Sequence, residues 1–200
     1  MTKIGITLGI LVLALSACFG PGQAKRYFDF QPLLIEHAGE GPTLDKVLYI
    51  DRVEVEDLWN DFRIIYRPSS MELNYYPNEF WAGKPDKLLR DTIYHFFSVR
   101  GAFRGLSLDP DRDNPDWILR CRVHRLEEFD LAQTWSARLA MDFAVVEAKS
   151  GTVIQNRSFD RAMPLNRRSV SDLPVVLSRI LTEELEALLQ SLRGKGPSSR

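Results

Sequence analysis

The chain has 200 residues, and its 26 lysines and arginines nearly balance its 27 aspartates and glutamates, which gives a formal net charge of −1. A chain of this length can build one domain with a sizeable core. The balance of charge argues against a nucleic-acid-binding surface, which needs an excess of basic side chains on one face. The composition therefore predicts one globular domain and no nucleic-acid partner.

The first residues have the pattern of a bacterial lipoprotein signal. Lys3 precedes an apolar run, Ile4–Ala14, that is too short to span a membrane as a mature helix. Small residues then lead to Cys18, as a signal peptidase with a narrow pocket requires. We predict a signal peptide over residues 1–17, cleavage between Ala17 and Cys18, and lipid attachment at Cys18. An ordinary signal peptide with a chance cysteine is the alternative. With Cys18 lipidated, Cys121 is the one remaining thiol, which excludes an intramolecular disulfide.

Residues 18–26 are predicted to be a lipidated tether. The six residues Phe19–Ala24 reach at most about 20 Å when extended, so the domain must sit close to its membrane. Phe19 stands where an aspartate commonly retains lipoproteins at the inner membrane. We therefore expect the protein at the periplasmic face of the outer membrane, with the inner membrane less favoured.

The next part of the chain predicts strands followed by a helix. Tyr27–Phe30 is expected to be a short strand, and Glu36–Pro42 a loop. The β-rich runs Val47–Asp57 and Arg63–Leu73 are expected to be antiparallel neighbours. After Pro85, apolar side chains recur at helical spacing and predict a helix of about four turns; they are Leu89, Ile93, Phe96 and Phe97.

Four aromatic residues stand between the second run and this helix: Tyr75, Tyr76, Phe80 and Trp81. Two interpretations are open. The aromatic side chains can belong to the core and its rim, or they can form a contact surface for a protein or lipid partner. Trp81 is the weaker surface candidate, because it directly precedes the helix.

The second half of the chain predicts more strands and a final helix. Apolar side chains alternate over Leu119–Val123 and again over Leu139–Val145, and Lys149-Ser150-Gly151 is a hairpin turn. Ser171 and Asp172 are candidate caps of the final helix, with Pro174 in its first turn. The helix has an apolar stripe that we expect to cover the sheet, with a partner-binding helix as the alternative; the stripe consists of Leu173, Leu177, Ile180, Leu181, Leu185, Leu188 and Leu192.

The predicted fold is an α/β single-domain sandwich with a mainly antiparallel sheet and two main helices packed on it. The domain is expected to cover residues 27–193, with a polar tail over 194–200.

Motifs for catalysis or cofactor binding are absent from the sequence. His37, His95 and His124 are far apart, and no H-E-x-x-H, G-x-S-x-G or P-loop is present. An acidic segment has calcium-loop spacing, but it lacks the glycine and the glutamate of such a loop, so a solvated loop is favoured; its carboxylates are Asp109, Asp111, Asp113 and Asp116. We expect no metal, no cofactor and no enzymatic activity.

The segment around the four aromatics resembles the ABC-type transport auxiliary lipoproteins, a PqiC-like family. Ile64-Ile65-Tyr66-Arg67 resembles the family's tetrapeptide at the end of a strand, Tyr75-Tyr76 its tyrosine-rich strand, and Trp81-Ala82 its Trp-Ala pair before a helix. The resemblance extends over roughly residues 27–192.

The resemblance implies a lipid-anchored accessory component of an ABC or MCE-type system that moves lipids or other hydrophobic substrates between membranes. The implied partners are the MCE-domain protein and the permease and ATPase of the transporter. Some family members assemble into rings, so the resemblance also implies that a homo-oligomeric ring can form. Two alternatives stay open: a lipoprotein that assists outer-membrane protein or lipopolysaccharide assembly, and a periplasmic hydrolase.

Overall fold

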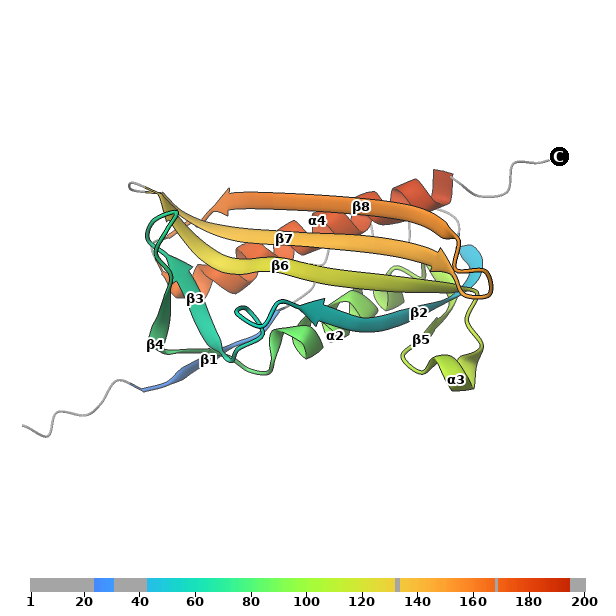
Figure 1. Cartoon of the computed structure of the whole chain (residues 1–200), viewed down its shortest axis with the longest axis horizontal. Coiled ribbons are helices and arrows are strands. Elements are labelled where there is room, and N and C mark those ends of the chain that lie inside the picture. The colour runs from blue at the N-terminus through green and yellow to red at the C-terminus, as the bar shows by residue number, and fades with distance from the viewer. Residues whose placement is uncertain (1–23, 31–42, 132–133, 168, 195–200) are drawn as a thin grey trace, which may run out of the picture.

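The computed structural model describes residues 24–30, 43–131, 134–167 and 169–194. Within these ranges the chain forms one eight-stranded sheet with two main helices on one face, which confirms the predicted α/β class (Figure 1). The strands are β1 (Arg26–Phe28), β2 (Leu44–Val55), β3 (Arg63–Arg67), β4 (Asn74–Trp81), β5 (Phe103–Ser107), β6 (Trp117–Leu131), β7 (Thr134–Glu147) and β8 (Val153–Pro164). The helices are α2 (Pro85–Val99), the short α3 (Pro110–Asp113), the 3-10 turn η2 (Val170–Asp172) and α4 (Leu173–Gly194).

Strand β6 is the centre of the sheet. One edge of β6 pairs with β7 in an antiparallel ladder, and β7 pairs in the same way with β8. The other edge pairs in parallel with two strands, first β2 along Trp117–Val123 and then β3 at Glu128 and Phe129. Beyond β3 lie β4 and β1, and beyond β2 lies β5.

The expected antiparallel pairing of the Val47–Asp57 and Arg63–Leu73 runs is wrong. Both strands run parallel to β6, one after the other along the same edge. The connection between them does not reverse the chain; within it, Trp59 is buried and its Nε1 donates to Glu127 of β6 at 3.1 Å. The second strand also ends at Arg67, and the tyrosine pair forms part of a separate strand, β4, which pairs antiparallel with β3.

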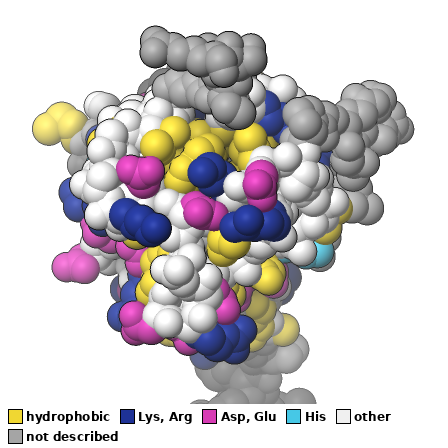
Figure 2. Space-filling view, turned by 90° about the vertical axis from the view of Figure 1, so that its right-hand side faces the viewer, with side chains coloured by type: hydrophobic (Ala, Val, Ile, Leu, Met, Phe, Trp, Pro, Cys, Tyr) yellow, Lys and Arg dark blue, Asp and Glu magenta, His cyan; other side chains and the backbone are white. Residues whose placement is uncertain are grey.

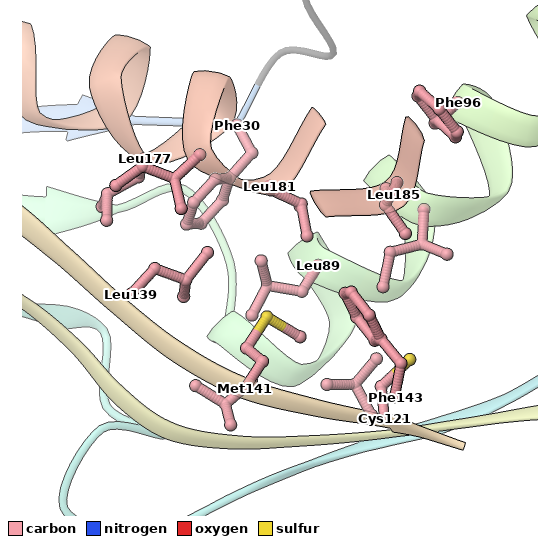
Figure 3. Packing of buried hydrophobic residues seen from close by; sticks show 14 of the residues in the cluster. Phe30, Leu89, Phe96, Cys121, Leu139, Met141, Phe143, Leu177, Leu181 and Leu185 are labelled. Carbon is pink, nitrogen blue, oxygen red and sulfur yellow. The ribbon is translucent and has the colours of Figure 1, made fainter. Parts of the chain in front are cut away.

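The core lies between the sheet and the helices. Figure 3 shows Leu139, Met141 and Phe143 of β7 pointing toward the leucines of α4 and toward Leu89 of α2. The apolar stripes predicted for both helices are buried, as is the apolar side of each alternating strand. Burial of this kind contributes roughly 25 cal/mol per Å² of apolar surface, so the helical periodicity identified the face that stabilises the fold.

The ends of α4 and its charged contacts fix this helix on the sheet. Ser169, rather than the expected Ser171, caps the preceding turn by accepting a hydrogen bond from the Ser171 amide. Farther along, Arg157 and Arg161 of β8 both donate to the buried Glu184 carboxylate, at 2.6 and 3.0 Å. Among the described residues, no helix is both long and apolar enough to span a bilayer.

Candidate functional site

The predicted lipid-attachment and cleavage residues, Ala17 and Cys18, lie outside the described residues, as do His37 and the loop Glu36–Pro42. The described chain begins at Ala24, two residues before β1. Strand β1 pairs in parallel with β4 and so brings the start of the domain beside the aromatic segment.

The four predicted aromatic residues divide between the two faces of β4. Trp81 is only 2% exposed and stacks on Phe30 with a centroid distance of 4.8 Å, so it is a core residue rather than part of a contact surface. Tyr76 is half-buried, and its hydroxyl donates to Glu128 at 2.9 Å. Tyr76 and Trp81 therefore stabilise the fold.

Tyr75 and Phe80 share the face of β4 on which Arg63 lies, and both are partly buried; Tyr75 also packs against the edge of the core. The strand register sets Phe80 beside Tyr27 of β1 and beside Arg63 of β3. The Arg63 guanidinium lies 3.8 Å from the centroid of the Tyr75 ring, close enough for a cation–π contact. A register shift between β3 and β4 lets both Tyr75 and Phe80 reach this face.

Two adjacent buried acids of β6, Glu127 and Glu128, contact residues of β3 and β4 and so join these strands to the main part of the sheet. Glu127 accepts two hydrogen bonds from the Arg67 guanidinium, at 3.0 and 3.1 Å, and a third from Trp59. Because three charge-assisted hydrogen bonds converge on Glu127, its buried charge is compensated. Arg67 in turn ends β3, so the ion pair fixes β3 against β6.

Glu128 points to the opposite side of β6 and has a different environment. Its Oε1 accepts from Tyr76, whereas its Oε2 is buried and has no hydrogen-bond partner among the described residues. Burial away from water raises the pKa of Glu128 to about 7; the Tyr76 hydrogen bond opposes this shift, and the nearby Asp130 charge adds to it. Glu128 therefore titrates near neutral pH.

His124 bridges two strands on the open face of the sheet. Its Nδ1 lies 2.9 Å from Glu56 and its Nε2 lies 2.7 Å from Asp142. The hydrogen bonds to Asp142 and then Glu56 raise the pKa of His124 above its usual value. A protonated ring can donate to both carboxylates, so the charged form ties the end of β2 to β6 and β7.

The acidic segment is used locally. Asp109 accepts from the Asp111 amide, Asp113 accepts from the Ser107 hydroxyl, and Asp116 accepts from the Val47 amide. Within the described parts of the chain, no group of three histidine, cysteine or acidic side chains has metal-binding geometry. Cys121 is buried, and burial raises the pKa of its thiol, so its side chain is a poor nucleophile.

Sequence reasoning missed the two buried acids and the His124 bridge. One signal for the acids was available: Glu127 and Glu128 stand between Leu126 and Phe129 within a strand. Because successive side chains of a strand point to opposite faces, one of two adjacent acids must face the core. The bridge had no comparable signal, since Glu56 and Asp142 are distant from His124 in sequence.

Comparison with known proteins identifies related sequences and folds. The chain matches the family model described as ABC-type transport auxiliary lipoprotein component over residues 35–192. No curated protein matches the chain. The fold is similar to the crystal structure of a protein from Xanthomonas campestris, with 18% identity, a TM-score of 0.68, and coverage of 86% of this chain and 96% of that one. A second structure, of an uncharacterized protein, has 16% identity, a TM-score of 0.68, and coverage of 85% and 99%.

Proposed function

Since this chain belongs to the family of ABC-type transport auxiliary lipoproteins, we propose that it is a lipid-anchored periplasmic component of an ABC/MCE-type transport system. The family match over residues 35–192 is the observation that carries the proposal. The component docks onto the MCE-type protein of its system, and the system moves lipids or other hydrophobic substrates between membranes. Cys18 is its lipid-attachment site, and Phe19 favours sorting to the outer membrane.

The proposed role is structural rather than catalytic. The ionisable groups with specific contacts are engaged in joining elements of the fold: Arg67 to Glu127, His124 to Asp142, and Arg157 to Glu184. A subunit of this kind acts by holding its partner at a membrane. Elemental analysis and an esterase and phosphatase panel on the purified protein test this part of the proposal, and a stoichiometric metal or a turnover would overturn it.

The docking surface that we propose is the β3–β4 turn with the adjacent Tyr75. Met71, at the turn, is 95% exposed, and a methionine side chain adapts readily to a partner. Tyr75 stands near the same end of β4, and the contact with Arg63 holds its ring in place. Aromatic residues held in this way dominate many interface hot spots.

Co-purification tests the proposal. Tagged lipoprotein is isolated from detergent-solubilised membranes, and bound proteins are identified against an unrelated lipoprotein control. We expect enrichment of the MCE-type protein or of the permease and ATPase. Enrichment of outer-membrane assembly factors instead would support the alternative role in protein or lipopolysaccharide assembly, and enrichment of neither group would refute the transport role.

A further inference from the structure

The two exposed aromatic side chains lie at the end of the domain where the chain enters β1. Among the described residues, Tyr27 (64% exposed) and Phe62 (48% exposed) are the aromatics in the set of exposed large hydrophobic side chains; the others are aliphatic. Tyr27 pairs with Phe80 in the β1–β4 register. The Phe62 carbonyl accepts from the Trp81 amide at 2.6 Å, which places Phe62 next to the same end of β4.

Two lysines flank these aromatics. Lys25 Nζ lies 5.4 Å from the centroid of the Phe80 ring, and Phe80 in turn lies 5.8 Å from the Tyr27 ring. Lys84 is exposed just beyond the end of β4. We call Lys25, Tyr27, Phe62, Phe80 and Lys84 the tether patch.

The tether patch has cations available for an external ligand. The neighbouring arginines are already neutralised, Arg26 by Glu79 and Arg63 by Asp61. No described acidic residue lies within salt-bridge distance of Lys25 or Lys84, although the Lys84 charge acts on the nearby Asp61 carboxylate. Aromatic rings combined with lysines are the composition that favours the headgroup region of a bilayer, where the rings contact the acyl boundary and the ammonium groups stay in water.

The tether patch lies at the end of the domain that is closest to the membrane anchor. The stretch Phe19–Ala24, which leads from the predicted lipid anchor to the first described residue, reaches at most about 20 Å. Strand β6 alone, with 15 residues, is about 50 Å long. Figure 1 shows β1 and the β7–β8 turn at opposite ends of the molecule. The patch is therefore held near the bilayer, whereas the far end need not be.

The far end has a different surface. Figure 2 looks onto this end and shows acidic and basic side chains interspersed around a group of hydrophobic ones. Val153, which follows the β7–β8 turn, is 53% exposed and is a matched control for Phe62 because both are exposed apolar positions.

We propose that the tether patch rests on the phospholipid headgroup region of the membrane that holds the Cys18 anchor. The inference depends on the lipid anchor of the proposed function. A second, non-covalent contact beside the anchor gives the domain one orientation on the bilayer, in the way that two weak membrane signals together make stable attachment. The patch residues bind lipid surface rather than the protein partner, which binds at the β3–β4 turn.

The test uses the full lipidated protein in vesicles of phosphatidylethanolamine and phosphatidylglycerol. An environment-sensitive fluorophore is attached to Phe62→Cys or, as the control, to Val153→Cys. Cys121 is buried and does not compete for the label. Lipids with a quencher near the headgroup are then included. We expect the label at position 62 to lose most of its fluorescence and the label at position 153 to lose none.

Flotation of the same vesicles separates the two possible failures. If the protein floats and the label at position 62 is not quenched more than the label at position 153, the membrane contact is refuted and the anchor stands. If the protein does not float, the anchor is refuted, and the membrane contact and the membrane part of the proposed function are refuted with it.

Discussion

Replacement of Glu128 by glutamine should stabilise the protein at alkaline pH and change little at acidic pH. The Glu128 carboxyl is buried, one of its oxygens has no hydrogen-bond partner among the described residues, and its pKa is raised to about 7 from 4.5. Glutamine has the same shape as the protonated acid and can still accept the hydrogen bond from Tyr76, but it cannot ionise.

The direction in which the free energy of unfolding changes with pH follows from proton binding in the folded and unfolded states. Below pH 4.5, the ordinary value, Glu128 is protonated in both states and its burial costs no charge desolvation. Between that pH and about 7 only the folded protein keeps the proton, so the free energy of unfolding falls as pH rises. One unit of pKa difference corresponds to about 1.4 kcal/mol, so the full effect is about 3.5 kcal/mol above pH 7. The Glu128→Gln variant lacks this loss.

Urea unfolding of both proteins, followed by tryptophan fluorescence from pH 4.5 to 8.5, measures the difference in the free energy of unfolding. Other titrating groups are common to both proteins and cancel in the difference. We expect a difference near zero at pH 4.5 that grows to about 3.5 kcal/mol in favour of the variant above pH 7. A difference that does not change with pH would refute the reasoning.

The neighbouring acid provides a control of opposite sign. Glu127→Gln removes the buried charge that compensates the partly buried Arg67 guanidinium and weakens the hydrogen bond from Trp59. Removing one partner of a buried ion pair typically costs about 3–5 kcal/mol. Glu127→Gln should therefore destabilise the protein at neutral and alkaline pH. Glu128→Gln should stabilise it at the same pH.

Three further predictions concern the anchor, the His124 bridge and the docking surface. Cys18→Ala should leave an unlipidated, uncleaved precursor, and Phe19→Asp should shift the protein toward the inner membrane; labelling with a palmitate analogue and membrane fractionation check these outcomes, and equal labelling of Cys18→Ala and wild type would contradict the first. His124→Gln should lower the free energy of unfolding by about 1 kcal/mol at most below pH 6.5, the ordinary histidine pKa, because the ring is partly exposed. This destabilisation should disappear as pH rises through the raised pKa of His124. Urea unfolding at pH 5.5 and 9 measures it, and a larger effect at pH 9 would contradict the prediction. Tyr75→Ala should weaken binding to the purified MCE-type partner at least tenfold, or about 1.4 kcal/mol, while Val153→Ala leaves it unchanged; an unchanged titration for Tyr75→Ala would rule out the proposed surface.

The helices and the long strands could be predicted because their signals are local. Pro85, the helical spacing of Leu89 and Ile93, and the glycine turn at Gly151 each depend on a few consecutive residues. Gly151 has a positive φ of 71°, which suits the turn that the sequence predicted there. The confirmed parts of the fold are those in which neighbouring residues alone determine the backbone.

The order of the strands could not be predicted, because distant contacts set it. Two β-rich runs separated by a short connection usually form a hairpin, yet β3 continues along β6, and the contacts that accompany this path, such as Trp59 with Glu127, span 68 positions of sequence. The division of the aromatic residues between the two faces of β4 also depends on pairing between strands rather than on local sequence. A register shift between β3 and β4 places Tyr75 and Phe80 on one face and Trp81 on the other, and no local periodicity indicates such a shift.

The buried acids connect the body of the protein to the part that has both proposed contacts. Strands β1, β4 and β3, together with the residues that directly flank them, include the tether patch and the docking turn. Their register with β6 consists of Tyr66 with Glu128 and Arg67 with Phe129. Glu127 strengthens this narrow junction through Arg67 on one face, and Glu128 does so through Tyr76 on the other. Because both proposed surfaces lie beyond the junction, these contacts, together with the buried Trp81, help to set how the sheet and helices are oriented relative to the membrane and the partner. Because burial raises the pKa of Glu128 to about 7, this carboxyl gains or loses its proton near neutral pH at the contact between β3 and β6.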